Sequence, residues 1–290
     1  MPGFLYDYPT FKSDIETPVV KDQDERAGER LKKMVSPFIL RRRKRDVLKE
    51  LPDKLEETRF ARMDKSQAKL YDAQAMHMKS VIGMKSDADL SRSRIEILAE
   101  LMKIRQICCD PGLCFDGYKG GSAKREMCMD LLQSLADGGH KTLLFSQFTT
   151  MLELIEKDLD KAGLKYYKIT GATPKEQRLK LVNTFNDDDT PVFLISLKAG
   201  GTGLNLTGAD SVVHYDPWWN VSAENQATDR AHRIGQKSIV TVYKLIIKGS
   251  IEEKIVKLQE EKAKLAEDVL SAEGISSSSL NRDELMELLV

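Results

Sequence analysis

Three polar side chains in the C-terminal half of the sequence have a spacing that suits the binding of a phosphate. Gln226, Arg230 and Arg233 are four and three residues apart, so in a helix they would lie on one face. An arginine presents a planar, permanently charged guanidinium whose paired donors match a phosphate. The same spacing is also typical of an amphipathic helix with solvated arginines. The surrounding residues must therefore decide between the two interpretations.

The segments before these residues favour the phosphate site. Val192–Ser196 is an apolar run typical of a buried strand, and Gly200–Gly203 is rich in glycine. A second apolar run, Ser211–Tyr215, leads into a turn in which Trp218 and Trp219 are adjacent. The sequence therefore predicts a strand, a glycine-rich loop, a second strand, an aromatic turn and then the arginine segment.

In order and in residues, this arrangement resembles the second motor lobe of the Swi/Snf-type DNA translocases, a branch of the superfamily-two helicases, and is nearest to bacterial members. Further segments resemble the same family in the same order: Pro37–Arg42, Leu51–Lys54, Lys141–Phe148, Ile169–Arg178 and the helix after Gly249. The ending His232-Arg-Ile-Gly-Gln236 is similar to this branch and unlike the branches that unwind RNA. Each segment alone is weak evidence, but together they are specific.

The resemblance implies that this lobe faces the ATP of a two-lobe motor. The expected catalytic residues are Arg230, Arg233 and Gln226, with the two arginines acting as fingers and Arg233 reaching the γ-phosphate. The expected ATP-binding residues are Gly201, Gly203 and Asp229. The two glycines would let the backbone approach the nucleotide. Asp229 would either orient a neighbouring arginine or remain a solvated helix residue.

The resemblance also implies a grip on DNA, and parallel sheets normally present ligands at the carboxyl ends of their strands. The expected DNA-binding residues are Ser146, Gln147, Gly171, Thr173, Lys198, Ala199, Gly200 and Trp219. Lys198 would supply charge to a phosphate, whereas the Thr173 hydroxyl is alternatively used as a helix cap. For both tryptophans, packing within the lobe is the alternative to DNA contact. The basic run Arg41–Arg45 is either a solvated face or a further DNA contact.

The residues that hold phosphates and magnesium in such motors do not occur in this sequence. It contains no Gly-Lys dipeptide, which a phosphate-binding loop requires. Neither Asp24-Glu25 nor Asp283-Glu284 follows an apolar strand. We therefore expect ATP and Mg²⁺ to be held mainly by an N-terminal motor lobe in cis, and this C-terminal half alone to be inactive. The spacing of the four cysteines is not that of a zinc site, so no metal ligands are expected.

The expected function is therefore that of a DNA-dependent ATPase, with the first lobe, double-stranded DNA and a DNA-bound protein complex as partners. Two alternatives remain. An RNA helicase lobe would share the fold and the arginine fingers, and a degenerate lobe would serve only protein contacts. The ending at His232–Gln236 with the helix that follows favours DNA translocation, and the intact Arg230 and Arg233 argue against a degenerate lobe.

The overall composition neither supports nor excludes nucleic-acid binding. The 290 residues include 45 basic and 45 acidic side chains, so any DNA site must rest on local patches. Charged residues make up 31% and hydrophobic residues 41%, as in ordinary globular proteins. No apolar run reaches the ~20 residues that span a bilayer. We expect a cytoplasmic, nucleoid-associated protein in a bacterium, or a nuclear one in a eukaryote.

Strands that alternate with helices must position these residues. Apolar strands are predicted at Thr142–Phe145, Tyr166–Ile169, Val192–Ser196, Ser211–Tyr215 and Val240–Ile246. Such alternation predicts an α/β fold with a mostly parallel sheet and helices on both faces, which the resemblance makes RecA-like. An N-terminal helical and linker region and a C-terminal brace helix at 250–270 complete the expected architecture.

The sequence divides into four expected regions: a linker and remnant of the first lobe at 1–62, a helical protrusion at 63–120, the RecA-like second lobe at 121–248, and the brace helix with its tail at 249–290. Glu56–Arg62 has a strand-like alternation. By resemblance this strand completes the sheet of the first lobe, which would leave it with an unpaired edge here. Residues 1–62 are therefore expected to be displaced, or mobile unless they pack on another molecule.

Overall fold

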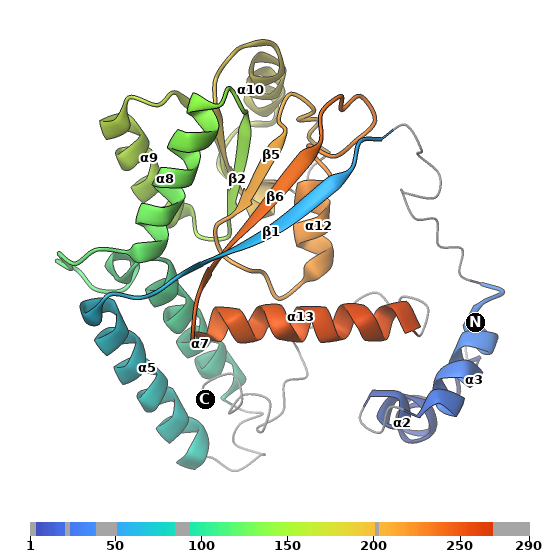
Figure 1. Cartoon of the computed structure of the whole chain (residues 1–290). Helices are drawn as coiled ribbons and strands as arrows, with labels where there is room; N and C mark the ends of the chain where they lie inside the picture. Colours follow the sequence, from blue (N-terminus) through green and yellow to red (C-terminus); the bar gives the residue numbers. More distant parts are fainter. Residues whose placement is uncertain (1–3, 21–23, 39–50, 85–92, 201–202, 269–290) are drawn as a thin grey trace. The chain divides into compact units, whose positions relative to one another are not determined.

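The computed structural model describes residues 4–20, 24–38, 51–84, 93–200 and 203–268 (Figure 1). They fall into two compact units, one formed by the N-terminal segment and the chain from Lys257, and one that ends at Val256. The helices of the N-terminal segment are α1 Tyr8–Phe11, a π-helical turn Lys12–Glu16, α2 Thr17–Val20 and α3 Glu25–Val35. They enclose a small core of Ile15, Val19 and Ala27. The larger unit contains the sheet and the candidate site.

The larger unit is built on a six-stranded sheet in which every neighbouring pair is parallel. In the spatial order β1-β6-β5-β2-β4-β3, its strands are β1 Lys54–Ala61, β6 Val240–Ile247, β5 Ser211–His214, β2 Thr142–Ser146, β4 Val192–Ser196 and β3 Tyr166–Ile169. β2, β4 and β5 are buried along their whole length, because helices cover both faces. The predicted α/β fold with a mostly parallel sheet is confirmed.

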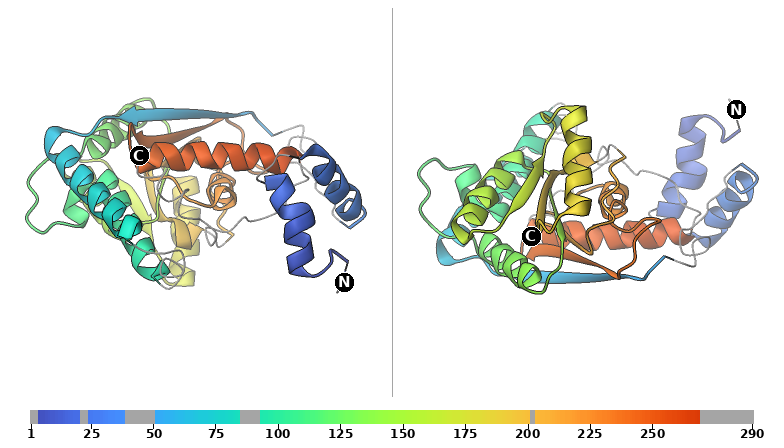
Figure 2. Two further views of the ribbon diagram at one scale, coloured as in Figure 1. Left: turned by 90° about the horizontal axis from the view of Figure 1, so that it is seen from below. Right: turned by 90° about the horizontal axis from the view of Figure 1, so that it is seen from above.

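Helices cover both faces of this sheet (Figure 2), and an apolar cluster lies on each face. The covering helices are α8 Ala123–Asp137, α9 Thr149–Ala162, α10 Lys175–Asp187 and α12 Val221–Thr228. α8 and α9 pack on one face against strand residues such as Leu144 and Leu194. α10 and α12 pack on the other face against Leu143 and Phe145. Successive strand residues point to opposite faces, so each apolar run supplies both clusters.

Two packed helices, α5 Lys65–Met84 and α7 Arg94–Cys109, form what we call the helical protrusion. Asp64 caps α5, because its Oδ1 accepts a hydrogen bond from the Gln67 N–H at 2.7 Å. The Gln67 side chain donates in turn to the carbonyl of Ile107 at 2.8 Å. This buried bond ties α5 to α7.

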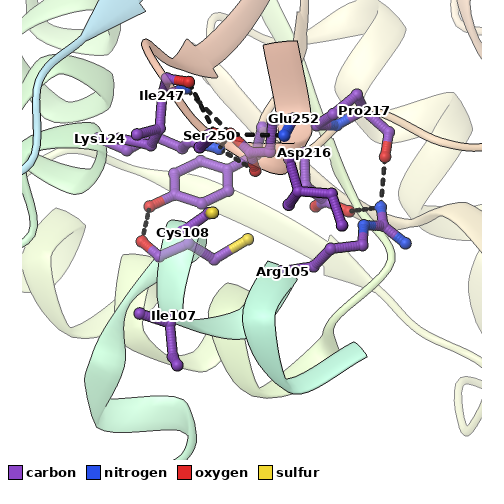
Figure 3. Close-up of polar contacts among 12 residues, drawn as sticks. Arg105, Ile107, Cys108, Lys124, Asp216, Pro217, Ile247, Ser250 and Glu252 are labelled. Carbon is purple, nitrogen blue, oxygen red and sulfur yellow. Dashed lines mark hydrogen bonds and ion pairs between the residues drawn. The ribbon is translucent and has the colours of Figure 1, made fainter. Parts of the chain in front are cut away.

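α13, Ile251–Asp268, is the predicted brace helix. Its first turn is fixed by an ion pair between Glu252 and Lys124 of α8, which are 2.5 Å apart and fully buried (Figure 3). Burial raises the pKa of Glu252, and the charge of Lys124 opposes that rise. The Ile251 N–H also donates to the hydroxyl of Tyr71 at 2.7 Å. Removing one partner of the ion pair would leave a buried charge unpaired, so this contact anchors the first turn of α13 to α8.

The prediction that Glu56–Arg62 belongs to the sheet of another lobe and lacks a partner strand is wrong. β1 pairs in parallel with β6 along its whole length, from Lys54 opposite Val240 to Ala61 opposite Ile247. Without β1, the backbone groups on one side of β6 would be unpaired. β1 therefore completes this sheet, and residues 54–61 are not displaced from it.

Candidate functional site

The two arginines of the predicted phosphate site do not lie on a helix. α12 ends before them, and residues 229–236, which we call the arginine turn, follow it. The carbonyl of Arg230 accepts a hydrogen bond from the Leu206 N–H at 3.0 Å. This bond holds the chain against the segment that precedes β5, so the helix does not continue. The expectation that Gln226, Arg230 and Arg233 share one helical face is therefore wrong.

A single buried amide holds the arginine turn in place. The Nε2 of Gln236 donates to the carbonyls of Ala209 and Ala231, at 2.7 and 3.1 Å. Its Oε1 accepts hydrogen bonds from the backbone N–H groups of Lys237 and Ser238, both at 2.8 Å. Gln236 is only 8% exposed, so these bonds are shielded from water. They supply the fixed geometry that a longer helix would otherwise have given.

The arginine turn lies at the amino edge of the sheet, where the parallel strands begin. Leu206 and Ala209, which it contacts, precede β5. The Nε2 of His232 lies 2.7 Å from the carbonyl oxygen of Pro52, which precedes β1. The turn itself leads into β6. The segments that enter three parallel strands therefore meet at this turn.

Positive charge is concentrated in the arginine turn. Arg230 is 8% exposed, whereas Arg233 and Gln226 are exposed and Asp229 is half-buried. Burial lowers the pKa of Arg230, the charge of Arg233 lowers it further, and Asp229 acts in the opposite direction. The two guanidiniums therefore repel each other. An anion bound beside them would relieve that repulsion.

The glycine-rich loop is described in part. It starts from a short helix, α11 Leu197–Gly200, in which Ala199 is 2% exposed. Gly203 has a φ of +46° and no protein atom within 4 Å of where a Cβ would lie, so glycine serves the backbone conformation there. Outside the described part of the chain lie Gly201, the side chain of Lys198 and the run Arg41–Arg45.

At the carboxyl edge of the sheet, Ser146 is used inside the protein. Its hydroxyl donates to Asp216 Oδ1 at 2.6 Å and accepts from the Phe148 N–H at 3.1 Å, and the residue is fully buried. The neighbouring Gln147 is half-buried, and its N–H donates to Asp216 Oδ1 at 3.3 Å. The Ser146 side chain therefore joins the loops after β2 and β5 and does not reach the surface.

The two adjacent tryptophans differ in their contacts. Trp218 packs against the core cluster around Phe145, and its backbone N–H donates to Glu224 Oε1 at 2.9 Å. The ring centroid of Trp219, which is half-buried, lies 5.9 Å from the guanidinium carbon of Arg105. Trp218 thus packs within the lobe, and Trp219 lies beside a buried charge at the carboxyl edge.

Arg105 is a residue of this edge that the sequence analysis did not single out. It lies on α7 in line with Ile97 and Leu101 and is 1% exposed. Its Nη1 donates to Gln147 Oε1 at 3.0 Å. Arginine is rarely buried so fully unless it is paired. A charged residue in an apolar stripe is therefore the signal that would have identified it.

The loop between β3 and α10 is held by another arginine. The Nε of Arg178 donates to the carbonyl of Thr173 at 2.7 Å, and its Nη2 donates to that of Gly171 at 3.0 Å. The Thr173 hydroxyl accepts from the Thr170 N–H at 3.1 Å. α10 begins after Pro174 with no side-chain cap, so the expected use of Thr173 as a helix cap is wrong. Gly171 is exposed, and Thr173 is half-buried.

The remaining side chains offer no grouped metal ligands. In the described ranges, no three His, Cys, Asp or Glu residues are placed together to hold an ion. The four cysteines are free thiols. Burial raises the pKa of Cys108 and of Cys128, so both stay protonated and unreactive. None of the described helices has the length and apolar character needed to cross a membrane.

Two family models match the chain, one after the other. A model described as the SNF2-related domain matches residues 1–113. A model described as the helicase conserved C-terminal domain matches residues 123–235. The second match contains β2 to β5, α12 and most of the arginine turn.

Relatives in bacteria and archaea are similar along nearly the whole chain. YwqA of Bacillus subtilis, a protein named as an ATP-dependent helicase/translocase, is 38% identical over 99% of this chain and 32% of its own length. An uncharacterized ATP-dependent helicase of Mycoplasma pneumoniae is 35% identical, over 99% of this chain and 27% of its own. The solved Sulfolobus solfataricus SWI2/SNF2 ATPase core in complex with dsDNA gives a TM-score of 0.68 at 33% identity, over 99% of this chain and 61% of that one. The chain thus spans about a third of the length of these two curated relatives.

Proposed function

This chain belongs to the SNF2-related family of SWI/SNF helicase-type proteins, and on that premise we propose that it is the C-terminal half of an ATP-driven motor that translocates on double-stranded DNA. The arginine turn carries the proposal. Two guanidiniums lie there at one edge of a RecA-like sheet, and a buried amide fixes their backbone. Because Arg233 is exposed, its charge can reach a ligand held outside this lobe.

In the proposed motor, the arginine turn completes the site of ATP hydrolysis. Arg233 reaches the γ-phosphate, and Arg230 acts as a second finger. Their charge stabilises the negative charge that develops during phosphoryl transfer, with little covalent work by the protein. Gln226, exposed on α12, positions the fingers or touches the phosphates. Gly201, Gly203 and Asp229 line the nucleotide.

The donors of this chain suit phosphates and not a metal cation. Guanidiniums, an amide nitrogen and glycine N–H groups donate hydrogen bonds, whereas magnesium takes oxygen ligands. We therefore place the phosphate-binding loop and Mg²⁺ in an N-terminal lobe of the whole protein. On this proposal the 290-residue chain alone shows no measurable ATP hydrolysis.

For DNA we propose the carboxyl edge of the sheet. Trp219, Gln147 and the Gly171–Thr173 loop lie there, and Lys198–Gly200 follows β4 at the same edge. Contacts of this kind go mainly to the phosphate backbone, so binding does not depend on base sequence. Ser146 contributes by holding Asp216 in place. A DNA-bound protein complex is a further partner that the family resemblance implies.

The test is the ATPase activity of the whole protein with double-stranded DNA, single-stranded DNA or RNA, and with no nucleic acid as the control. We expect double-stranded DNA to stimulate hydrolysis most. Stronger stimulation by RNA would identify an RNA helicase instead. Hydrolysis that no nucleic acid stimulates would favour a lobe that serves only protein contacts.

A further inference from the structure

We propose that Arg105 is a positioning residue that fixes Trp219 and Gln147, so that the helical protrusion controls the DNA-facing carboxyl edge. This inference rests on the proposed DNA-binding function of that edge. It adds a residue from α7, and it gives the protrusion a role in the motor.

The Arg105 guanidinium joins three segments that are far apart in sequence, and Figure 3 shows its contacts with Asp216 and Pro217. Its Nη1 donates to Gln147 Oε1, in the loop after β2, at 3.0 Å. Its Nη2 donates to the carbonyl of Pro217, the residue before the two tryptophans. The same Nη2 lies 3.7 Å from Asp216 Oδ2, which makes an ion pair. One side chain of the protrusion therefore sets the spacing of two loops at the carboxyl edge.

The planar shape of this side chain also fixes the aromatic rings. The guanidinium carbon lies 5.9 Å from the ring centroid of Trp219 and 6.0 Å from that of Phe148. A guanidinium can stack on a ring and donate hydrogen bonds from its edge at the same time. A lysine ammonium is a compact point charge without that plane. Replacing Arg105 by lysine would keep the charge and lose the fork, so the charge and the geometry can be separated by experiment.

The network is more elaborate than packing requires. Arg105 is 1% exposed and Asp216 is fully buried, and burying two charges costs free energy that their attraction only partly repays. Burial raises the pKa of Asp216, while Arg105 and the Ser146 hydroxyl lower it. Apolar residues of similar volume would often hold a core as well. Apolar residues would not supply hydrogen-bond donors that reach Gln147 and the Pro217 carbonyl together.

The position of Arg105 on α7 makes it a mechanical link. α7 packs on α5 in the helical protrusion, and it ends at Cys109. A tilt or shift of α7 would withdraw the guanidinium from Gln147, Pro217 and Trp219 together. The protrusion would thereby loosen the DNA-facing ring without touching DNA itself.

The test follows the ring of Trp219 and the response to DNA separately, in the whole protein. Tryptophan is replaced by 5-fluorotryptophan, and the Trp219 signal in fluorine NMR is identified by its loss in Trp219→Phe. In Arg105→Lys we expect that signal to shift and to show a larger solvent-isotope effect, because the ring is less enclosed. The DNA concentration for half-maximal ATPase stimulation should rise about tenfold, as expected when one charge-assisted hydrogen bond is lost.

Arg125→Lys is the matched control, since Arg125 forms ion pairs with Asp110 and Asp158 at 2.5 and 2.9 Å and contacts neither loop. It should leave the Trp219 signal and the DNA response unchanged. If Arg105→Lys does not fold, Gln147→Met removes the Nη1 acceptor instead and should shift the Trp219 signal in the same direction, by less.

Two results would overturn the inference. One is an unchanged Trp219 signal in folded Arg105→Lys, or in Gln147→Met where that variant replaces it. The other is a shifted signal with an unchanged half-maximal DNA concentration, which would separate the ring from DNA. A parent protein that DNA does not stimulate contradicts the proposed function, and with it the control of DNA binding by Arg105. The NMR comparison would then still decide whether Arg105 positions Trp219.

Discussion

The two edges of the sheet use arginine in opposite ways. At the amino edge, the amide of Gln236 holds the backbone, and Arg233 is exposed. At the carboxyl edge, Arg105 and Arg178 donate to loop carbonyls, and the half-buried ring of Trp219 lies beside Arg105. An arginine that donates its hydrogen bonds to a loop uses its charge within the protein and does not offer it to a ligand. The role of each arginine therefore depends on whether its own guanidinium or another residue holds the loop beside it.

The same helix connects the two edges. α12 begins after Asn220, whose Oδ1 accepts from the Ser222 N–H at 2.9 Å, just beyond Trp219. It ends at the arginine turn, and its eight residues rise about 12 Å. A displacement of the arginine turn along this axis would therefore be transmitted to the residue that precedes the helix. The two edges differ in chemistry and share one rigid connection.

The strongest test of the comparison removes the exposed charge at the amino edge. Arg233→Ala in the whole protein should lower the ATP turnover by at least about 10²-fold, because an arginine finger contributes on that scale. ATP affinity should change far less, since the phosphate loop of the other lobe supplies most ground-state binding. Steady-state hydrolysis and equilibrium nucleotide binding measure the two quantities. Arg62→Ala, which removes another exposed arginine, is the control, and a normal turnover in Arg233→Ala would refute the finger assignment.

A second test removes the residue that holds the arginine turn and leaves the charges in place. Gln236→Leu deletes the donor to the Ala209 and Ala231 carbonyls, and should cost ~2–4 kcal/mol in the free energy of unfolding. Turnover should fall between about tenfold and about a hundredfold, because the fingers lose their fixed geometry. Urea denaturation and ATPase assays check these values. Gln133→Leu, which loses only an exposed bond to Asp137, should change stability by less than ~0.5 kcal/mol.

At the carboxyl edge, we predict that the neutral ring of Trp219 binds DNA without an ionic contact. Trp219→Ala should raise the DNA concentration for half-maximal stimulation about tenfold, within the range of base and ring contacts. The dependence of DNA affinity on salt should stay nearly the same, because a neutral ring releases no counterion. DNA titrations at several salt concentrations measure both. If Trp219→Ala instead unfolds the lobe, the ring is a packing element and its DNA role is to be dropped.

The smallest expected effect concerns the one lysine assigned to a phosphate. The chain alone should bind DNA weakly, with a dissociation constant of roughly 10⁻⁴–10⁻⁶ M at physiological salt. Lys198→Ala should flatten the slope of affinity against salt by about one unit without creating a sequence preference. Fluorescence anisotropy with labelled duplexes gives the slope. Lys165→Ala, at an exposed position before β3, should leave the slope unchanged, and an equal change in both variants would contradict the specific role of Lys198.

The sequence predicted the strands well because their periodicity is a local property. β2, β3 and β4 lie within a residue of the predicted bounds, and Gly163 ends α9 in the left-handed conformation that a helix terminus favours. The Asp64 cap also involves only residues three apart. Each of these features is fixed by neighbours along the chain, so one sequence is enough to find it.

The arginine turn, β1 and Arg105 could not be predicted in the same way. The end of α12 is set by a bond to Leu206 and by the amide of Gln236. The partner of β1 is β6, which lies far along the sequence. Arg105 and Pro217, which are in contact, are likewise far apart in the sequence. Tertiary hydrogen bonds decide all three features. Helical spacing can mark Arg105 as a charge in an apolar stripe, but it does not show which residues that charge contacts.

The parallel pairing of β1 with β6 gives the lobe resistance to pulling. The chain enters β1 at Lys54 and leaves β6 at Ile247, at opposite ends of one eight-residue ladder. Tension between these two points acts along the strands, so it loads all the ladder bonds together instead of opening them one at a time. Force applied to the chain on either side would therefore be carried through the lobe as shear. If the proposed motor function holds, a lobe anchored in this way can pull on its flanking segments while its own sheet stays intact.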